Sequence, residues 1–314
     1  IIAWLKNILG TPTYMKWRNQ WLFGAEEDPV MLQELPAIDL DWPPVSRHAN
    51  GPVILISPTQ RSGSNFIYQL LSLHPGLKSL ADQDGLPQEF FFHTYSEALK
   101  AYTEKTVPTW STWLKDPSSR ENIAHRLLAG MGQGMLSELG GGNLNSSWLF
   151  RAPDARGIEN IFHLFPAARV FLLYRDGRDT CASFMNSWGG ESALTDFAHR
   201  WNSRIQEMIQ FQQVANKKGY GDRVLEIHYE EFVRDPVQMI KSILPKLGLA
   251  SDEYPYDKVG KVPLLGTSEA RVVHWEPEQK PSDFNPIGRW KTWSPKQQKD
   301  FMGIAGPSLR QIGY

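Results

Sequence analysis

The chain has 314 residues, with 33 Lys plus Arg against 34 Asp plus Glu, and a formal net charge of −1 at pH 7. A content of 41% hydrophobic and 21% charged residues is ordinary for a folded domain and excludes extensive disorder. No apolar run approaches the roughly 20 residues of a membrane span, and the balanced charge argues against a nucleic-acid partner. The single cysteine, Cys181, excludes an intramolecular disulfide and a cysteine zinc site, and it favours a reducing cytoplasm.

Residues 1–50 are predicted to form an N-terminal arm, and residues 51–314 the domain itself. The apolar stretch 1–9 has the spacing of a short helix and is stopped by Gly10 and Pro12. We expect this helix to pack on the body of the protein. A helix that contacts a membrane surface is the alternative. The sequence carries no information on oligomeric state.

Three segments combine an apolar run of strand length, a polar loop and a helical pattern: 52–73, 168–188 and 222–247. In the third, Asp235 is the predicted N-cap of the helix and Gly248 its end. Strand, loop and helix that recur in this order predict an α/β fold with a parallel sheet flanked by helices, and a P-loop-like first turn. We expect a single domain.

Other segments are expected to be insertions around this sheet. Residues 93–147 have a mostly helical pattern, and residues 190–217 have that of one long amphipathic helix ended by Gly219. The stretch 250–300 is rich in Pro, Gly and Trp and predicts an ordered loop.

The strongest local signal is the first loop, within residues 52–66, PVILISPTQRSGSNF. A short loop between a buried strand and a helix start turns backbone N–H groups and the positive end of the helix dipole toward an anion. Gly63 lets the backbone approach closely, and Arg61 can clamp anionic oxygens. Further donors are Ser62, Ser64 and Asn65. The GxxxxGK[ST] pattern of a Walker A loop is absent. A polar turn without function is the plain alternative.

The second signal is residues 170–184, VFLLYRDGRDTCASF. Arg175 follows an apolar strand, at the edge where open α/β sheets bind ligands. Ser183 follows about two helical turns later and can point at the same anion. Two alternatives stay open for this segment: Asp176 as a magnesium ligand after a Walker-B-like strand, or a surface Arg-Asp pair.

Together the two loops resemble those of the sulfotransferases that use 3′-phosphoadenosine 5′-phosphosulfate (PAPS), in particular bacterial trehalose-type and tyrosylprotein-type members. The resemblance implies that Arg61 to Asn65 bind the 5′-phosphosulfate and that Arg175 and Ser183 bind the 3′-phosphate. It also implies that adenosine 3′,5′-bisphosphate (PAP) is the product and that no metal takes part.

Three further segments are similar to that family. Residues 228–236, HYEEFVRDP, imply that Tyr229 lies near the adenine. Residues 285–295, NPIGRWKTWSP, resemble a glycine-basic loop that closes over the nucleotide, here with Arg289, Trp290 and Lys291. Residues 150–179 resemble a run in tyrosylprotein and bacterial members. In this run Arg151 stands where relatives carry Lys, which keeps the charge but changes the hydrogen-bond geometry.

A proton acceptor for the acceptor hydroxyl is expected at Glu89, in residues 85–95, GLPQEFFFHTY. This segment resembles one in trehalose-type and heparan sulfate enzymes, where the glutamate is the base. The alternatives are that Glu89 pairs with Arg61 or caps a helix, and that His93 is the base. The resemblance implies a carbohydrate, glycolipid or small metabolite as the acceptor rather than tyrosine.

The sequence thus predicts in-line transfer of a sulfuryl group to a hydroxyl, and two other functions stay open. A P-loop kinase for a small molecule is disfavoured because Gly63 is not followed by Lys-Ser/Thr and because Arg175 and Ser183 occur as a pair. A non-catalytic nucleotide-binding protein is disfavoured by the presence of both Arg61 and Glu89.

Overall fold

A computed structural model describes residues 42–43, 51–79, 116–139, 147–262, 267–269, 272–274 and 285–314. All of them belong to one compact unit, Ile38–Tyr314. Of the predicted arm, only Trp42 and Pro43 are described. Both predicted bases, Glu89 and His93, lie outside the described residues.

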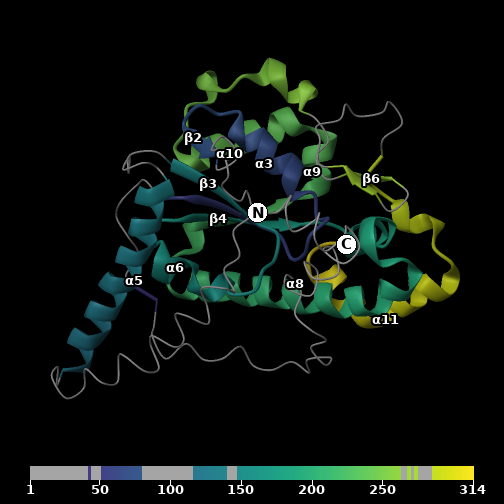
Figure 1. Cartoon of the computed structure of the whole chain (residues 1–314), viewed down its shortest axis with the longest axis horizontal. Coiled ribbons are helices and arrows are strands. Elements are labelled where there is room, and N and C mark those ends of the chain that lie inside the picture. The colour runs from purple at the N-terminus through teal and green to yellow at the C-terminus, as the bar shows by residue number, and fades with distance from the viewer. Residues whose placement is uncertain are drawn as a thin grey trace, which may run out of the picture. The chain divides into compact units, whose positions relative to one another are not determined.

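The core of the described part is a sheet of five parallel strands in the order β2-β3-β1-β4-β5 (Figure 1). The strands are β1 (Val53–Ile56), β2 (Leu77–Ser79), β3 (Ser147–Ala152), β4 (Arg169–Tyr174) and β5 (Val224–His228). In the centre of the sheet Ile54 pairs with Phe150 on one side and Val170 on the other. The predicted α/β fold with a parallel sheet is confirmed.

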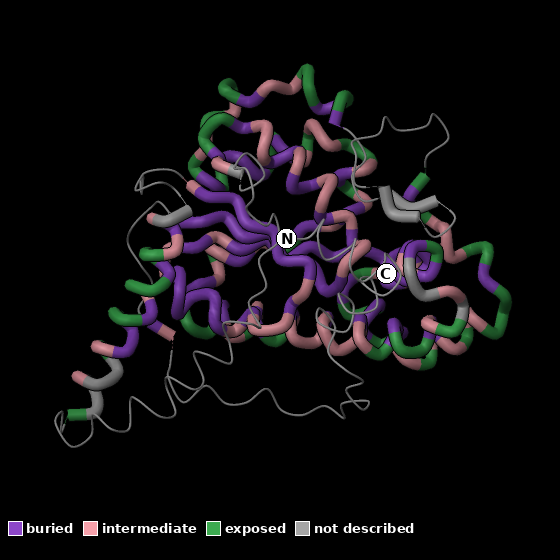
Figure 2. The backbone as a smooth tube through the Cα atoms, viewed as in Figure 1, coloured by how far each residue is buried: buried purple, intermediate pink, exposed green. Residues whose placement is uncertain are grey.

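Helices cover both faces of this sheet. One face packs on α3 (Ser64–Ser72), α9 (Tyr229–Arg234) and α10 (Pro236–Leu247). The other packs on α5 (Pro117–Leu139), α6 (Ile161–Leu164), α7 (Gly177–Phe184), α8 (Leu194–Lys217) and α11 (Pro295–Gln311). Successive side chains of a strand point to opposite faces, so Val53 and Leu55 enter one core and Ile54 and Ile56 the other. The central strands are therefore buried along their length (Figure 2).

The remaining described elements are short. They are η3 (Ile158–Asn160), the π-helical turn η4 (Met185–Gly189), η5 (Glu191–Ala193), η6 (Gly221–Arg223), η7 (Ser251–Glu253), η8 (Tyr256–Lys261), β6 (Thr267–Glu269), β7 (Val272–His274) and η9 (Arg289–Thr292). Strands β6 and β7 form a separate antiparallel pair.

Strong local signals in the sequence located their elements well. Asp235 caps α10 by accepting a hydrogen bond from the Gln238 N–H, and Gly248 ends that helix with a φ of 70°.

The prediction of loop throughout 250–300 is wrong, since this stretch contains η7, η8, η9 and the start of α11. Pro295 is the first residue of α11, a position that proline favours, and Ser294 completes a capping box.

The described part of the predicted arm packs on the body. The Trp42 ring lies 5.0 Å from that of Phe162 and 5.3 Å from that of Phe211, between centroids, and its Nε1 donates to the carbonyl of Glu159. The Tyr220 hydroxyl donates to the carbonyl of Pro43 at 2.7 Å. Among the described helices, none is long and apolar enough to cross a membrane.

Candidate active site

The loops that follow β1 and β4 leave the sheet at the same edge, because the two strands are parallel neighbours. They lead to opposite faces: α3 packs on one face and α7 on the other. Such a switch point, outside the carboxyl ends of the strands, is where open α/β sheets bind ligands. The two loops that the sequence singled out therefore meet where a ligand is expected.

The first loop has a tight backbone with two left-handed residues. Arg61 has a φ of 71° and Gly63 a φ of 86°. Buried Ser62 supports the turn from within, since its hydroxyl donates to the carbonyl of Thr59 at 2.8 Å. A Cβ at Gly63 would lie 2.2 Å from the ring of Tyr229. Glycine is thus required here twice, by its conformation and by the close approach of the tyrosine.

We expect Gly63→Ala to destabilise the protein and to displace this loop. The left-handed conformation costs about 1–2 kcal/mol for a residue with a Cβ, and the contact with Tyr229 adds to it. A thermal melt should show Tm lower by at least about 2–4 °C. Gly130→Ala on α5 is the matched control, since its Cβ would meet nothing within 4 Å. Equal melting temperatures for the two variants would contradict this description of the loop.

The second loop brings a buried arginine to the first. Arg175 is 4% exposed and donates through Nη1 to the carbonyl of Arg61 at 2.6 Å. Its guanidinium carbon lies 4.5 Å from the centroid of the Tyr229 ring. The Nε of Arg175 is buried and has no hydrogen-bond partner among the described residues. A buried donor of this kind is costly unless a ligand accepts a hydrogen bond from it.

The predicted pairing of the two loops is visible in direct contacts. The Nε of Arg61 donates to the hydroxyl of Ser183, in α7, at 3.2 Å. Burial, together with the neighbouring charges of Arg175 and Arg289, lowers the pKa of Arg61 to about 10. Burial and Arg175 also lower the pKa of Arg289. Arg175 thus disfavours the charged forms of both Arg61 and Arg289, and a bound anion would stabilise this arrangement.

Residues 285–295 are the segment predicted to close over the nucleotide. Its residues Arg289, Trp290 and Lys291 lie in three different surroundings. Arg289 joins the arginine cluster through its charge. The Trp290 ring instead lies against Arg178, whose guanidinium carbon is 4.0 Å from the ring centroid. Lys291 is exposed. Only Arg289 of these three is thus brought to the other site residues in this structure.

Tyr229 lies beneath the first loop. It is 6% exposed, contacts Gly63 and Arg175 as described above, and has its pKa raised chiefly by burial. The structure therefore gives Tyr229 a supporting place in the site, and its proximity to an adenine stays a prediction.

The remaining donors of the first loop lie at the start of α3. Ser64 is its first residue and Asn65 its second. Arg151, buried at 5% exposure in β3, donates to the Ser64 hydroxyl at 3.5 Å. A further cation is thereby placed beside the loop. The sequence alone assigns Arg151 no role. A charged residue within an apolar strand was the signal that could have pointed to one.

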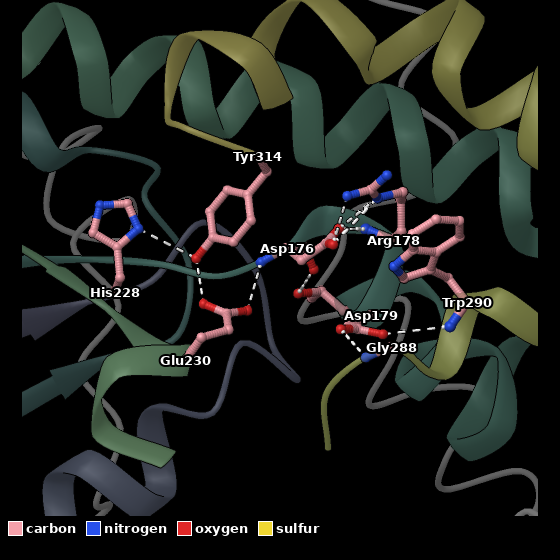
Figure 3. A network of polar contacts seen from close by, with 9 residues as sticks. Asp176, Arg178, Asp179, His228, Glu230, Gly288, Trp290 and Tyr314 are labelled. Atoms are coloured by element: carbon pink, nitrogen blue, oxygen red, sulfur yellow. Dashed lines mark hydrogen bonds and ion pairs between the residues drawn. The ribbon is translucent and has the colours of Figure 1, made fainter. Parts of the chain in front are cut away.

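Asp176 has a structural role. Its carboxylate caps α7 by accepting from the Arg178 N–H and forms an ion pair with the Arg178 side chain at 2.8 Å. The Asp176 N–H donates to the carboxylate of Glu230 at 3.1 Å (Figure 3). The alternative of a magnesium ligand therefore has no support here. Among the described residues no group of three or more His, Cys, Asp or Glu could hold a metal ion.

Comparison with known proteins assigns the chain to a family. The Sulfotransferase family matches residues 52–253, so the chain belongs to the sulfotransferase family. Protein-tyrosine sulfotransferase A of Caenorhabditis elegans is 24% identical over 276 residues, 84% of this chain and 67% of that protein. Protein-tyrosine sulfotransferase 1 of Danio rerio is 21% identical over 273 residues, 84% of this chain and 72% of that protein.

A solved structure shows the same fold. The sulfotransferase domain of the Synechococcus PCC 7002 olefin synthase aligns with a TM-score of 0.50 at 17% identity, over 87% of this chain and 98% of that domain. The resemblance to sulfotransferases that the sequence suggested is confirmed, including its tyrosylprotein branch. The likeness to trehalose-type members stays a prediction.

Proposed function

We propose that this protein transfers a sulfuryl group from PAPS to a hydroxyl group of an acceptor. The observation that carries the proposal is the convergence of Arg61, Arg175, Ser183 and Arg289 at the carboxyl edge of the sheet. The site is rich in positive charge in a chain whose net charge is only −1, as a binding site for a doubly phosphorylated nucleotide requires. Membership of the sulfotransferase family supports the same reaction.

The residues present fit such a nucleotide. The buried Nε of Arg175 lacks a hydrogen-bond partner among the described residues, and the Ser183 hydroxyl lies within reach of the same cluster through Arg61. These two side chains would hold the 3′-phosphate. Arg61 and the first N–H groups of α3 would hold the 5′-phosphosulfate, since the N-terminus of a helix favours an anion.

The chemistry falls mainly to charge stabilisation and positioning, by analogy with phosphoryl transfer. PAPS supplies an activated sulfuryl group whose leaving group is the 5′-phosphate of PAP. Negative charge grows on that phosphate as the S–O bond breaks, and the Arg61 guanidinium would stabilise it. We propose Glu89 as the group that accepts the proton of the attacking hydroxyl.

The acceptor is proposed to be a carbohydrate, a glycolipid or a small metabolite. The curated relatives named above as protein-tyrosine sulfotransferases make tyrosine peptides the necessary comparison. Incubation with ³⁵S-labelled PAPS and a panel of sugars, glycolipids and tyrosine peptides tests both the reaction and the acceptor. Label on a sugar hydroxyl is the expected result. Label on tyrosine alone would contradict the acceptor class. Tight binding of PAP without transfer to any acceptor would favour a non-catalytic protein.

Arg175→Ala should weaken the binding of PAP by about tenfold to a hundredfold. A charge-assisted hydrogen bond is worth about 1.5–3 kcal/mol, and the 3′-phosphate is remote from the reacting sulfur. The loss should therefore appear in KM for PAPS more than in kcat. Ser183→Ala should act in the same direction with a smaller effect, and titration calorimetry measures both.

Arg169→Ala is the matched control for this prediction. Arg169 begins the strand that Arg175 follows, and so lies at the opposite edge of the sheet. It should leave PAP affinity unchanged. Equal affinities in Arg175→Ala and Arg169→Ala, with both proteins folded, would remove the assignment of the 3′-phosphate site.

A further inference from the structure

We infer that Asp179 is a positioning residue: it anchors the loop of residues 285–291 and so holds Arg289 at the nucleotide site. The part that concerns the nucleotide rests on the proposed function above, while the anchor itself does not. Sequence reasoning assigned no role to Asp179.

Two hydrogen bonds carry the inference. Asp179 lies in the first turn of α7 and is 1% exposed. Its Oδ2 accepts from the Gly288 N–H at 2.8 Å, and its Oδ1 accepts from the Trp290 N–H at 3.3 Å (Figure 3). A buried carboxylate is costly unless it is hydrogen-bonded, and here both oxygens bond to the same loop. These two N–H groups flank Arg289, so the carboxylate fixes the backbone on both sides of that arginine.

Neighbours of Asp179 hold the same loop. Arg175 donates through Nη2 to the carbonyl of Pro286 at 2.8 Å. Arg178 stacks on Trp290, as described above. Gly288 has a φ of 80°, a conformation that glycine adopts without strain. The end of β4 and the first turn of α7 thus bind the loop at several points, among which Asp179 supplies the pair around Arg289.

Charge explains why an anchor is needed. Arg289 is held near Arg175, and burial together with repulsion from Arg175 lowers the pKa of Arg289. Before an anion binds, repulsion between the two guanidinium groups favours movement of Arg289 away from the site. Asp179 opposes this in two ways, because its charge favours the charged form of Arg289 and its oxygens fix the backbone. The empty protein is thereby kept ready for its anionic ligand, which reduces the ordering cost of binding.

Hydrogen exchange in the nucleotide-free protein tests the anchor directly. In Asp179→Asn one carboxylate oxygen is replaced by an NH₂ group, which cannot accept from a backbone N–H. The peptide that contains Gly288 and Trp290 should then exchange about tenfold faster than in the wild type, as expected for one lost hydrogen bond. Peptides of α7 and of the sheet should exchange as before.

Calorimetry with PAP tests the positioning role. Asp179→Asn should bind PAP about tenfold more weakly than the wild type, while kcat at saturating PAPS changes by less than about threefold, because Arg289 acts on the nucleotide and not on the sulfur. Gly288→Ala perturbs the loop from its own side and leaves the buried carboxylate intact, so it should weaken binding in the same direction. Asp300→Asn is the control, since Asp300 forms an exposed ion pair with Lys296 on α11 and takes no part in the loop contacts described above.

Each outcome has one meaning. Unchanged exchange at Gly288 and Trp290 in Asp179→Asn would overturn the anchor. Faster exchange throughout α7, or faster exchange of the loop with unchanged PAP affinity, would overturn the positioning role. If Asp179→Asn fails to fold, Gly288→Ala decides by the same two measurements. A wild type that binds no PAP would refute the proposed function, and the exchange experiment would still decide on the anchor.

Discussion

Arg61→Ala should lower kcat at saturating PAPS by about a hundredfold or more, the usual effect of removing one preorganised group that stabilises transition-state charge. Arg61 lies in the loop that precedes α3 and has its guanidinium at Ser183, beside Arg175 and Arg289. A cation fixed in this way costs no reorganisation when charge develops on the leaving phosphate. Single-turnover kinetics with a saturating donor measures the effect free of binding.

Arg61→Lys should recover part of this loss, because the charge remains while the planar set of donors is lost. Normal turnover of Arg61→Ala at saturating PAPS would contradict the assigned role. The depressed pKa of about 10 leaves Arg61 charged at neutral pH. As pH rises through about 10, the folded protein loses this charge before the unfolded chain does, so its affinity for PAP should fall there. The same fall should be smaller in Arg61→Ala.

Glu89→Gln should lower turnover by about 10²- to 10⁴-fold, the range for general-base catalysis, and leave PAP affinity nearly intact. The amide has the shape of the carboxylate but accepts no proton. The acid limb of the pH–rate profile should also vanish, provided that chemistry limits the wild type. Steady-state kinetics and calorimetry on the same preparation separate the two effects.

His93→Ala is the control for Glu89, and it should leave turnover almost unchanged. If Glu89 instead pairs with Arg61, then Glu89→Gln should lose thermal stability and PAP affinity together. Loss of turnover in His93→Ala with retention in Glu89→Gln would transfer the role of base to His93.

The meeting of the two loops was predictable from local sequence signals combined with one topological rule. The apolar runs that precede the loops of Arg61 and Arg175 mark buried parallel strands, and parallel strands present their carboxyl ends at one edge. Ser183 was predictable in the same way, from helical periodicity after Arg175. Each of these local signals needs only the order of residues within about 30 positions, the length of a βαβ unit.

Other parts of the site depend on contacts between distant residues. Asp179 and Gly288 are 109 positions apart, and nothing in the local pattern of RDGRD distinguishes a carboxylate that anchors a loop from one on the surface. Tyr229 lies under Gly63 only because β5 pairs with β4 and β4 with β1. Lys291 and Trp290 share a motif with Arg289, yet the backbone geometry directs the three side chains to different surroundings. Local sequence does not encode that geometry.

Titration calorimetry of the wild type in magnesium-free buffer tests the central claim most directly, with PAP compared against adenosine 5′-monophosphate, which lacks the 3′-phosphate. PAP should bind about tenfold to a hundredfold more tightly, since one charge-assisted contact set is worth about 1.5–3 kcal/mol. Arg175→Ala should bind the two nucleotides with nearly equal affinity. Equal affinities already in the wild type would contradict a site built for a 3′-phosphorylated sulfuryl donor. So would tighter binding of Mg·ATP than of PAP in a separate titration with magnesium present.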